Sequence, residues 1–169
     1  MLDDLETVPV LKEGKLFKAV DFNFWGFTFT PDPTRFYATL GTGGKTYLVE
    51  GDLAARRMRV VHEDVECPSL SPDDTRIAFK RRAAMDASGA RIWRLVVLQL
   101  STLEETTLVA ETRNVDDQVE WLNYQEILYA LPTADLQSSA GTDIWALKAD
   151  ATAPPRRLLH FAFSPAIVN

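Results

Sequence analysis

Cysteine and histidine are scarce in this chain, and their scarcity excludes several kinds of site. Among 169 residues there is one cysteine, Cys67, and the two histidines, His62 and His160, are far apart in the sequence. A single cysteine allows no internal disulfide and no cysteine-based zinc site, and distant histidines give no metal-binding pair at short spacing. We therefore expect no metal and no other cofactor.

Long apolar runs are also missing near the N-terminus. The first fourteen residues, MLDDLETVPVLKEG, carry three acids within the first six and no stretch of the length that a signal peptide or a membrane-spanning helix requires. We expect no membrane insertion by this chain, and a cytoplasmic location if Met1 is the true start.

Clusters of basic residues are few. The net charge is −6, and the basic runs Arg56-Arg57, Lys80-Arg82 and Arg156-Arg157 are short and scattered. A nucleic-acid partner is excluded because it requires lysine and arginine gathered on one face. The 46% of hydrophobic residues allow one sizeable core, so the length indicates a single domain.

The glycine cluster Gly41-Thr-Gly-Gly44 is followed by Lys45 and Thr46, which are the last letters of a phosphate-binding loop. Position 39 is threonine where that loop needs glycine, and the residues after Lys45 form a short strand-like run instead of a helix. Glycines between two strand-like runs are typical of a hairpin turn.

Runs of four to eight residues rich in β-branched and aromatic side chains recur between turn residues, and few segments have helical spacing. The sequence therefore predicts an all-β fold. The candidate strands are Val8–Leu11, Leu16–Val20, Gly26–Thr30, Phe36–Leu40, Thr46–Glu50, Met58–His62, Ser69–Ser71, Ile77–Lys80, Trp93–Leu100, Thr106–Ala110, Gln118–Leu122, Ile127–Leu131, Asp143–Lys148, Arg156–Phe161 and Ala166–Val168.

An internal repeat organises these strands. The first two copies align at an offset of 41 residues: Thr30-Pro-Asp-Pro-Thr-Arg-Phe-Tyr-Ala38 and Ser71-Pro-Asp-Asp-Thr-Arg-Ile-Ala-Phe79. A weaker third copy follows, in which Ile127 takes the place of Ile77 at an offset of 50: Leu122-Asn-Tyr-Gln-Glu-Ile-Leu-Tyr-Ala130. Four antiparallel strands every 40 to 50 residues is the period of a β-propeller blade. We predict three blades, at about 22–64, 65–112 and 113–161, with residues 1–21 and 162–169 as closing strands of one half-propeller domain.

Three blades alone leave two apolar faces uncovered, because a blade buries its faces against its neighbours. We therefore expect the ring to be completed by a second copy in a homodimer, or by a missing N-terminal half-propeller. Two copies would give six blades, which lies within the usual range of about 4–8 for propellers.

Several strings resemble a known family. They are Asp21-Phe-Asn-Phe-Trp-Gly26, Glu66-Cys-Pro-Ser-Leu-Ser-Pro-Asp73, Val115-Asp-Asp-Gln-Val-Glu-Trp-Leu122 and Ser164-Pro-Ala-Ile-Val168. Together they resemble the C-terminal half of actinobacterial TolB-like translocation proteins. The resemblance implies a six-bladed WD-repeat-like propeller at the cell envelope, outside the cytoplasmic membrane, and it implies no particular reaction.

In a propeller, the loops that enter the innermost strand and the loops between the second and third strands surround the channel mouth. These loops are Asp21–Trp25, Asp64–Pro68, Arg113–Gln118, Gly41–Lys45, Ala83–Arg91 and Thr133–Gly141. The candidate ligand-binding residues in them are Asp21, Asn23, Trp25, Lys45, Glu66, Asp116, Asp117 and Gln118. Local turn capping and packing between blades are competing explanations of the same residues.

The sequence contains no nucleophile elbow, and we predict no catalytic residues. The function predicted is a non-enzymatic module that binds a protein, peptide or cell-envelope component through the mouth loops. One alternative is a carbohydrate-active propeller in which two carboxylates face each other across the channel, drawn from Glu63, Asp64, Glu66, Asp116 and Asp117. Another is a structural half-ring that completes a partner chain.

Overall fold

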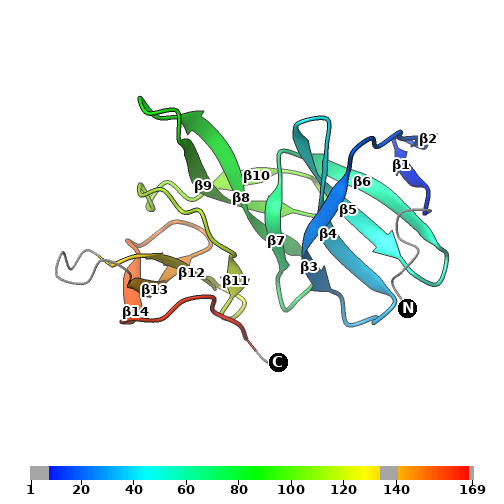
Figure 1. Ribbon diagram of the computed structural model, residues 1–169. Coiled ribbons are helices and arrows are strands. Elements are labelled where there is room, and N and C mark those ends of the chain that lie inside the picture. The colour runs from blue at the N-terminus through cyan, green and yellow to red at the C-terminus, as the bar shows by residue number, and fades with distance from the viewer. Residues whose placement is uncertain (1–7, 134–140, 168–169) are drawn as a thin grey trace. The chain divides into compact units, whose positions relative to one another are not determined.

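The protein was analysed as a computed structural model that describes residues 8–133 and 141–167. Every regular element in that part of the chain is a β-strand, and the strands form three sheets (Figure 1). The predicted all-β class is therefore confirmed.

The first sheet contains blade 1 and an N-terminal hairpin. The blade consists of β3 (Asn23–Phe29), β4 (Arg35–Thr42), β5 (Lys45–Asp52) and β6 (Arg57–Glu63), all antiparallel to their neighbours. The hairpin consists of β1 (Val10–Lys12) and β2 (Lys15–Leu16), and β1 pairs in parallel with β6. The sheet order is therefore β2-β1-β6-β5-β4-β3.

The other two sheets have four strands each. Blade 2 contains β7 (Glu66–Leu70), β8 (Arg76–Met85), β9 (Arg91–Gln99) and β10 (Glu105–Thr107), and blade 3 contains β11 (Glu120–Trp121), β12 (Glu126–Pro132), β13 (Thr142–Lys148) and β14 (Arg156–Leu159). In both blades the strands follow one another in chain order, as in a propeller blade.

One turn recurs in all three blades, before β4, β8 and β12. The Asp32 carboxylate accepts hydrogen bonds from the Thr34 amide at 2.9 Å and from the Thr34 hydroxyl at 2.7 Å, and Asp73 accepts the equivalent bonds from Thr75. In blade 3 Asn123 takes this place, and its side-chain oxygen accepts from the Gln125 and Glu126 amides at 2.8 and 3.0 Å. The third blade therefore has the same kind of turn, held by a side-chain oxygen, although its sequence differs from that of the first two copies.

Some strands differ from the sequence prediction. The expected mouth loop at Ala83–Arg91 is shorter than predicted, because β8 runs to Met85 and β9 starts at Arg91. The turn between them is closed by Asp86, which accepts the Ser88 and Ala90 amides, and by Gly89 with φ of 84°. β10 and β11 are shorter than expected. Residues 165–167 form no strand, and Val168 and residues 134–140 of the Thr133–Gly141 loop lie outside the described residues.

One face of blade 1 is buried under the N-terminal segment. Its core consists of Phe36, Ala38, Leu40, Tyr47, Val49 and Met58, together with Val10 from β1. Val8, Phe17, Ala19, Phe22 and Phe24 pack against it, and the Phe17 ring meets Tyr47 edge-on at 5.2 Å. Within the described residues, this predicted closing segment extends the outer edge of blade 1 and covers an apolar face.

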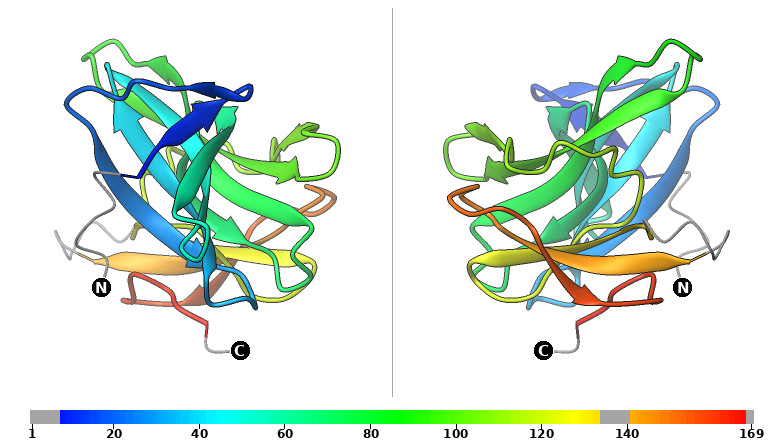
Figure 2. Two further views of the ribbon diagram at one scale, coloured as in Figure 1. Left: turned by 90° about the vertical axis from the view of Figure 1, so that its right-hand side faces the viewer. Right: turned by 90° about the vertical axis from the view of Figure 1, so that its left-hand side faces the viewer.

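Blades 2 and 3 share a core. Ala78, Leu95 and Val97 of blade 2 pack with Ile127, Tyr129 and Leu147 of blade 3, and with Val115 and Val119 of the connector between the blades. The opposite face of blade 3, made by Leu128, Ala130, Ile144 and Ala146, is covered by Leu122, Ala162 and Ile167. Figure 2 shows the C-terminal segment in red running along this sheet. The apolar faces that motivated the homodimer prediction are thus covered in part by the chain itself, while Phe29, Phe161 and Phe163 remain exposed.

The contacts divide the chain into two compact units, residues 1–68 and 69–169. The first contains blade 1 and the hairpin, and the second contains blade 3 and most of blade 2. No helix capable of crossing a membrane occurs in residues 8–133 or 141–167.

Candidate functional site

Four predicted site residues lie at one end of blade 1. Asn23 pairs with Gly41 at the start of β3, and Lys45 follows the two-residue turn between β4 and β5. Gly43 and Gly44 in that turn have φ of 57° and 75°, the values of a tight hairpin turn, so this glycine cluster is a hairpin and not a phosphate-binding loop. Asp21 precedes the strand, is exposed and has φ of 46°.

Trp25, the fourth of these residues, has a packing role. Its ring lies over Gly41, and a Cβ atom added to Gly41 would come within 2.6 Å of the ring. The neighbouring strand therefore needs glycine at this position. The Trp25 side chain remains half-buried, so part of its surface lies at the same end of the blade as Asn23 and Lys45.

Glu66, at the start of β7, is half-buried and already has an interaction partner. The next residue, Cys67, has φ of 53°, and its amide donates to the Thr39 hydroxyl at 3.0 Å. The Cys67 backbone also lies against Gly26, where an added Cβ would approach Cys67 Cα to 2.8 Å. This segment is therefore held by backbone contacts to blade 1, which fits a structural explanation of Cys67.

The three predicted residues in the connector to blade 3 are engaged in structural contacts. Asp116 forms an ion pair with Lys80, whose ammonium group also lies 4.7 Å from the centre of the Trp93 ring. Asp117 accepts the Ala130 amide at 3.0 Å, and the Gln118 amide group donates to the Val119 carbonyl at 3.3 Å. The contacts of Asp116 and Asp117 fix the connector to β8 and β12, and they are made over 36 and 13 positions and are not local turn caps.

A buried polar network that the sequence did not predict lies in the same unit. The Glu111 carboxylate accepts hydrogen bonds from the Tyr129 hydroxyl and from the amide and guanidinium of Arg113, whose guanidinium stacks 3.8 Å above Trp145. Burial alone would raise the pKa of Glu111, but the bonds from Arg113 and Tyr129 outweigh it and lower that pKa. Burial raises the pKa of Tyr129, and the Glu111 bond adds to the shift. Both groups keep fixed charge states, which suits a structural anchor.

Glu120 is a carboxyl group whose ionised form is disfavoured by its position in the fold. Burial at the start of β11 raises its pKa, although the Ser69 hydroxyl, which donates to it at 2.8 Å, and Gln118 partly offset the effect. A raised carboxyl pKa can mark a catalytic acid, but the groups that hydrogen-bond to Glu120, from Ser69 and Gln118, do not supply the second ionisable group that such chemistry needs.

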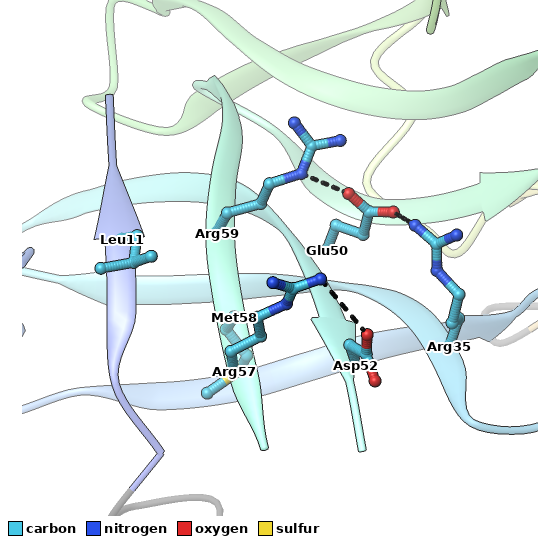
Figure 3. Close-up of a pocket in the computed structure, with 7 residues that line it drawn as sticks. All are labelled: Leu11, Arg35, Glu50, Asp52, Arg57, Met58 and Arg59. Atoms are coloured by element: carbon cyan, nitrogen blue, oxygen red, sulfur yellow. Dashed lines mark hydrogen bonds and ion pairs between the residues drawn. The ribbon is translucent and has the colours of Figure 1, made fainter. Parts of the chain in front are cut away.

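A charged pocket on blade 1 was also missed. A cavity of about 360 Å³ is lined by Leu11, Arg35, Glu50, Asp52, Arg57, Met58 and Arg59 (Figure 3). Figure 3 shows Glu50 between Arg59 and Arg35, which both bond to its carboxylate, and Arg57 beside Asp52. The sequence did contain a signal for this pocket, which is the spacing of its charged residues. Glu50 and Asp52 are two residues apart, and so are Arg57 and Arg59, so each pair shares one face of its strand.

Within residues 8–133 and 141–167, no cluster of three or more His, Cys, Asp or Glu side chains is arranged to hold a metal ion.

Comparisons with known proteins show similarity in structure. No protein-family model matches the sequence, and no curated protein matches it. Among solved structures, TolB from Acinetobacter baumannii has a TM-score of 0.63 at 14% identity over 85% of this chain and 34% of that chain. The β-propeller domain of the Trilobed protease from Pyrococcus furiosus has a TM-score of 0.57 at 15% identity, over 85% and 45% of the two chains.

Propellers from enzymes are similar as well. An oligogalacturonate lyase in complex with manganese has a TM-score of 0.58 at 19% identity, over 83% of this chain and 41% of that chain. This chain thus spans between about a third and a half of the three structures. At these identities the likeness shows the fold alone, which is that of β-propeller blades, as the sequence predicted.

Proposed function

We propose that the chain is a non-enzymatic binding module that holds a protein or peptide segment at the end of blade 1 where Asp21, Asn23 and Lys45 lie. The observation that carries the proposal is that these three exposed side chains make no hydrogen bond within the described residues, whereas Asp116, Asp117 and Gln118 are engaged. Exposed polar side chains without hydrogen-bond partners beside a half-buried tryptophan are typical of a peptide-binding surface.

The strand next to these residues supports the same proposal. β3 is the last strand of its sheet, so its outward backbone N–H and C=O groups have no neighbouring strand in that sheet. An extended peptide can pair with such an edge, and nearby side chains then select its sequence. The register of β3 shifts between Trp25 and Thr28, so the regular edge next to Asn23 is short and suits a peptide of a few residues.

The carboxylate-based enzyme is not the function that the contacts favour. Two of its candidate acids, Asp116 and Asp117, are bound to Lys80 and to the Ala130 amide, and in those positions they anchor the connector. A third candidate, Glu63, forms an ion pair with Lys12. The cell-envelope location implied by the TolB-like resemblance is part of our proposal, and fractionation of cells that produce the native protein tests it.

The test is a peptide-display selection on the immobilised chain, followed by affinity measurements on the selected peptides. We expect the double substitution Asn23→Ala with Lys45→Ala to weaken binding by about tenfold or more, since it removes hydrogen bonds worth about 1 kcal/mol each. Lys148→Ala, at an exposed lysine in blade 3, is the matched control and should leave binding unchanged. Equal binding by all three proteins would refute the proposal.

A further inference from the structure

The charged pocket on blade 1 carries a net positive charge at its surface. Three guanidinium groups, from Arg35, Arg57 and Arg59, face two carboxylates, from Glu50 and Asp52, which leaves one positive charge in excess. Glu50 is only 7% exposed, whereas the Arg57 and Arg59 side chains are 66% and 65% exposed. The negative charge is therefore at the floor, and the positive charge faces solvent.

The hydrogen bonds at the floor leave donors available above it. Arg59 reaches Glu50 through Nε, and Arg35 reaches it through one terminal nitrogen. The two terminal nitrogens of Arg59 make no bond within the described residues, and Arg57 is 3.7 Å from Asp52, beyond hydrogen-bond distance. Because a buried carboxylate already holds two guanidiniums in place, less side-chain freedom is lost when a ligand binds.

The size and walls of the cavity restrict the ligand. A volume of about 360 Å³ is at the small end for ligand sites, which suits one residue-sized group. Half-buried Leu11, which pairs with Arg59, adds an apolar wall beside the arginines. The single excess charge favours a carboxylate over a phosphate, because a phosphate carries about −1.5 to −2 and would be repelled by Glu50 and Asp52.

We propose that this pocket binds a carboxylate joined to a short aliphatic group, the chemistry of a peptide that ends in a residue such as leucine. The terminal nitrogens of Arg57 and Arg59 hold the carboxylate, and Leu11 contacts the aliphatic side chain. Guanidinium groups suit this task because their planar donors match the two oxygens of a carboxylate. The proposal does not depend on peptide binding near Asn23 and Lys45.

The experiment is an NMR titration of the isotope-labelled full chain with a short N-acetylated peptide that ends in leucine. We expect the amide signals of Leu11, Arg57 and Arg59 to shift with the free-acid peptide. The same peptide with an amidated C-terminus should bind at least about tenfold more weakly, because a charge-assisted hydrogen bond is lost. Inorganic phosphate serves as a third probe and should bind more weakly than the free acid.

Two variants complete the test. Arg57→Ala removes a guanidinium that does not bond to Glu50, so the floor stays intact, and we expect a loss of about tenfold or more in affinity for the free acid. Arg91→Ala makes the same charge change at an exposed site outside the pocket and should have no effect. Equal binding of acid and amide, tighter binding of phosphate, or an unaffected Arg57→Ala variant would each overturn the proposal.

Discussion

At the scale of single residues, Glu120 gives a prediction about pH. Its pKa is raised by burial, so between the ordinary glutamate pKa of 4.5 and that raised value the folded state binds more protons than the unfolded state. Stability from this group is therefore lost as the pH rises through that window. We expect Glu120→Gln to be at least as stable as the original chain at about pH 7, with the advantage disappearing at about pH 4.

Thermal unfolding of both proteins over this range measures the difference. Comparing variant with parent cancels the other carboxylates that titrate in acid, among them Asp32 and Asp73, whose pKa values are lowered by bonds to their own turns. Glu104→Gln changes an exposed acid and serves as the control. A Glu120→Gln variant that is less stable only near neutral pH would show that the ionised form is favoured by the fold.

Single residues were predictable where their partners are close in the sequence. The Asp32 and Asp73 turns are bonded to residues two positions away, so the Pro-Asp pattern was sufficient to find them. Asn123 makes the same bonds, although proline and aspartate are absent there. Glu111 was missed because its partner Tyr129 is 18 positions away and only the packing of two blades brings them together.

At the scale of elements, the N-terminal segment gives a prediction about stability. Phe17 is half-buried, packs on the core of blade 1 and meets the Tyr47 ring edge-on. We expect Phe17→Ala to lower the free energy of unfolding by about 1–3 kcal/mol, less than for a fully buried phenylalanine. Chemical denaturation measures this loss.

The neighbouring residue provides a matched control. Leu16 is 64% exposed, so Leu16→Ala should change stability by no more than about 0.5 kcal/mol. If both substitutions cost the same, the segment does not cover blade 1 in the way the contacts indicate.

Most strands were predictable because alternating apolar residues and turn residues mark them. Glu13 and Gly14, which form the turn between β1 and β2, both have positive φ. The position of the N-terminal segment on blade 1 could not be predicted, because the parallel pairing of Val10 with Met58 joins residues 48 positions apart. The extended β8–β9 hairpin was missed because residues 82–90 are all exposed and rich in alanine, so their sequence shows no alternation of apolar and polar side chains.

At the scale of the whole molecule, the coverage of the blades bears on assembly. The expectation of a homodimer depended on uncovered apolar faces. In the structure Phe36, Ala38 and Leu40 of blade 1 are at most 1% exposed, and the face of blade 3 that is turned away from blade 2 is buried by Ala162 and Ile167 together with Leu122. A second copy has correspondingly less apolar surface to bury, so ring closure has a smaller driving force.

We therefore expect the full chain to be a monomer near 19.0 kDa in light scattering across a dilution series. Removing residues 1–22 takes away Val10, Phe17, Ala19 and Phe22 and uncovers the blade 1 core, so the shortened chain should associate or aggregate as its concentration rises. A stable dimer of the full chain would contradict this argument. It would mean that contacts other than these two faces drive assembly, and it would restore closure of a six-bladed ring by two copies as the explanation.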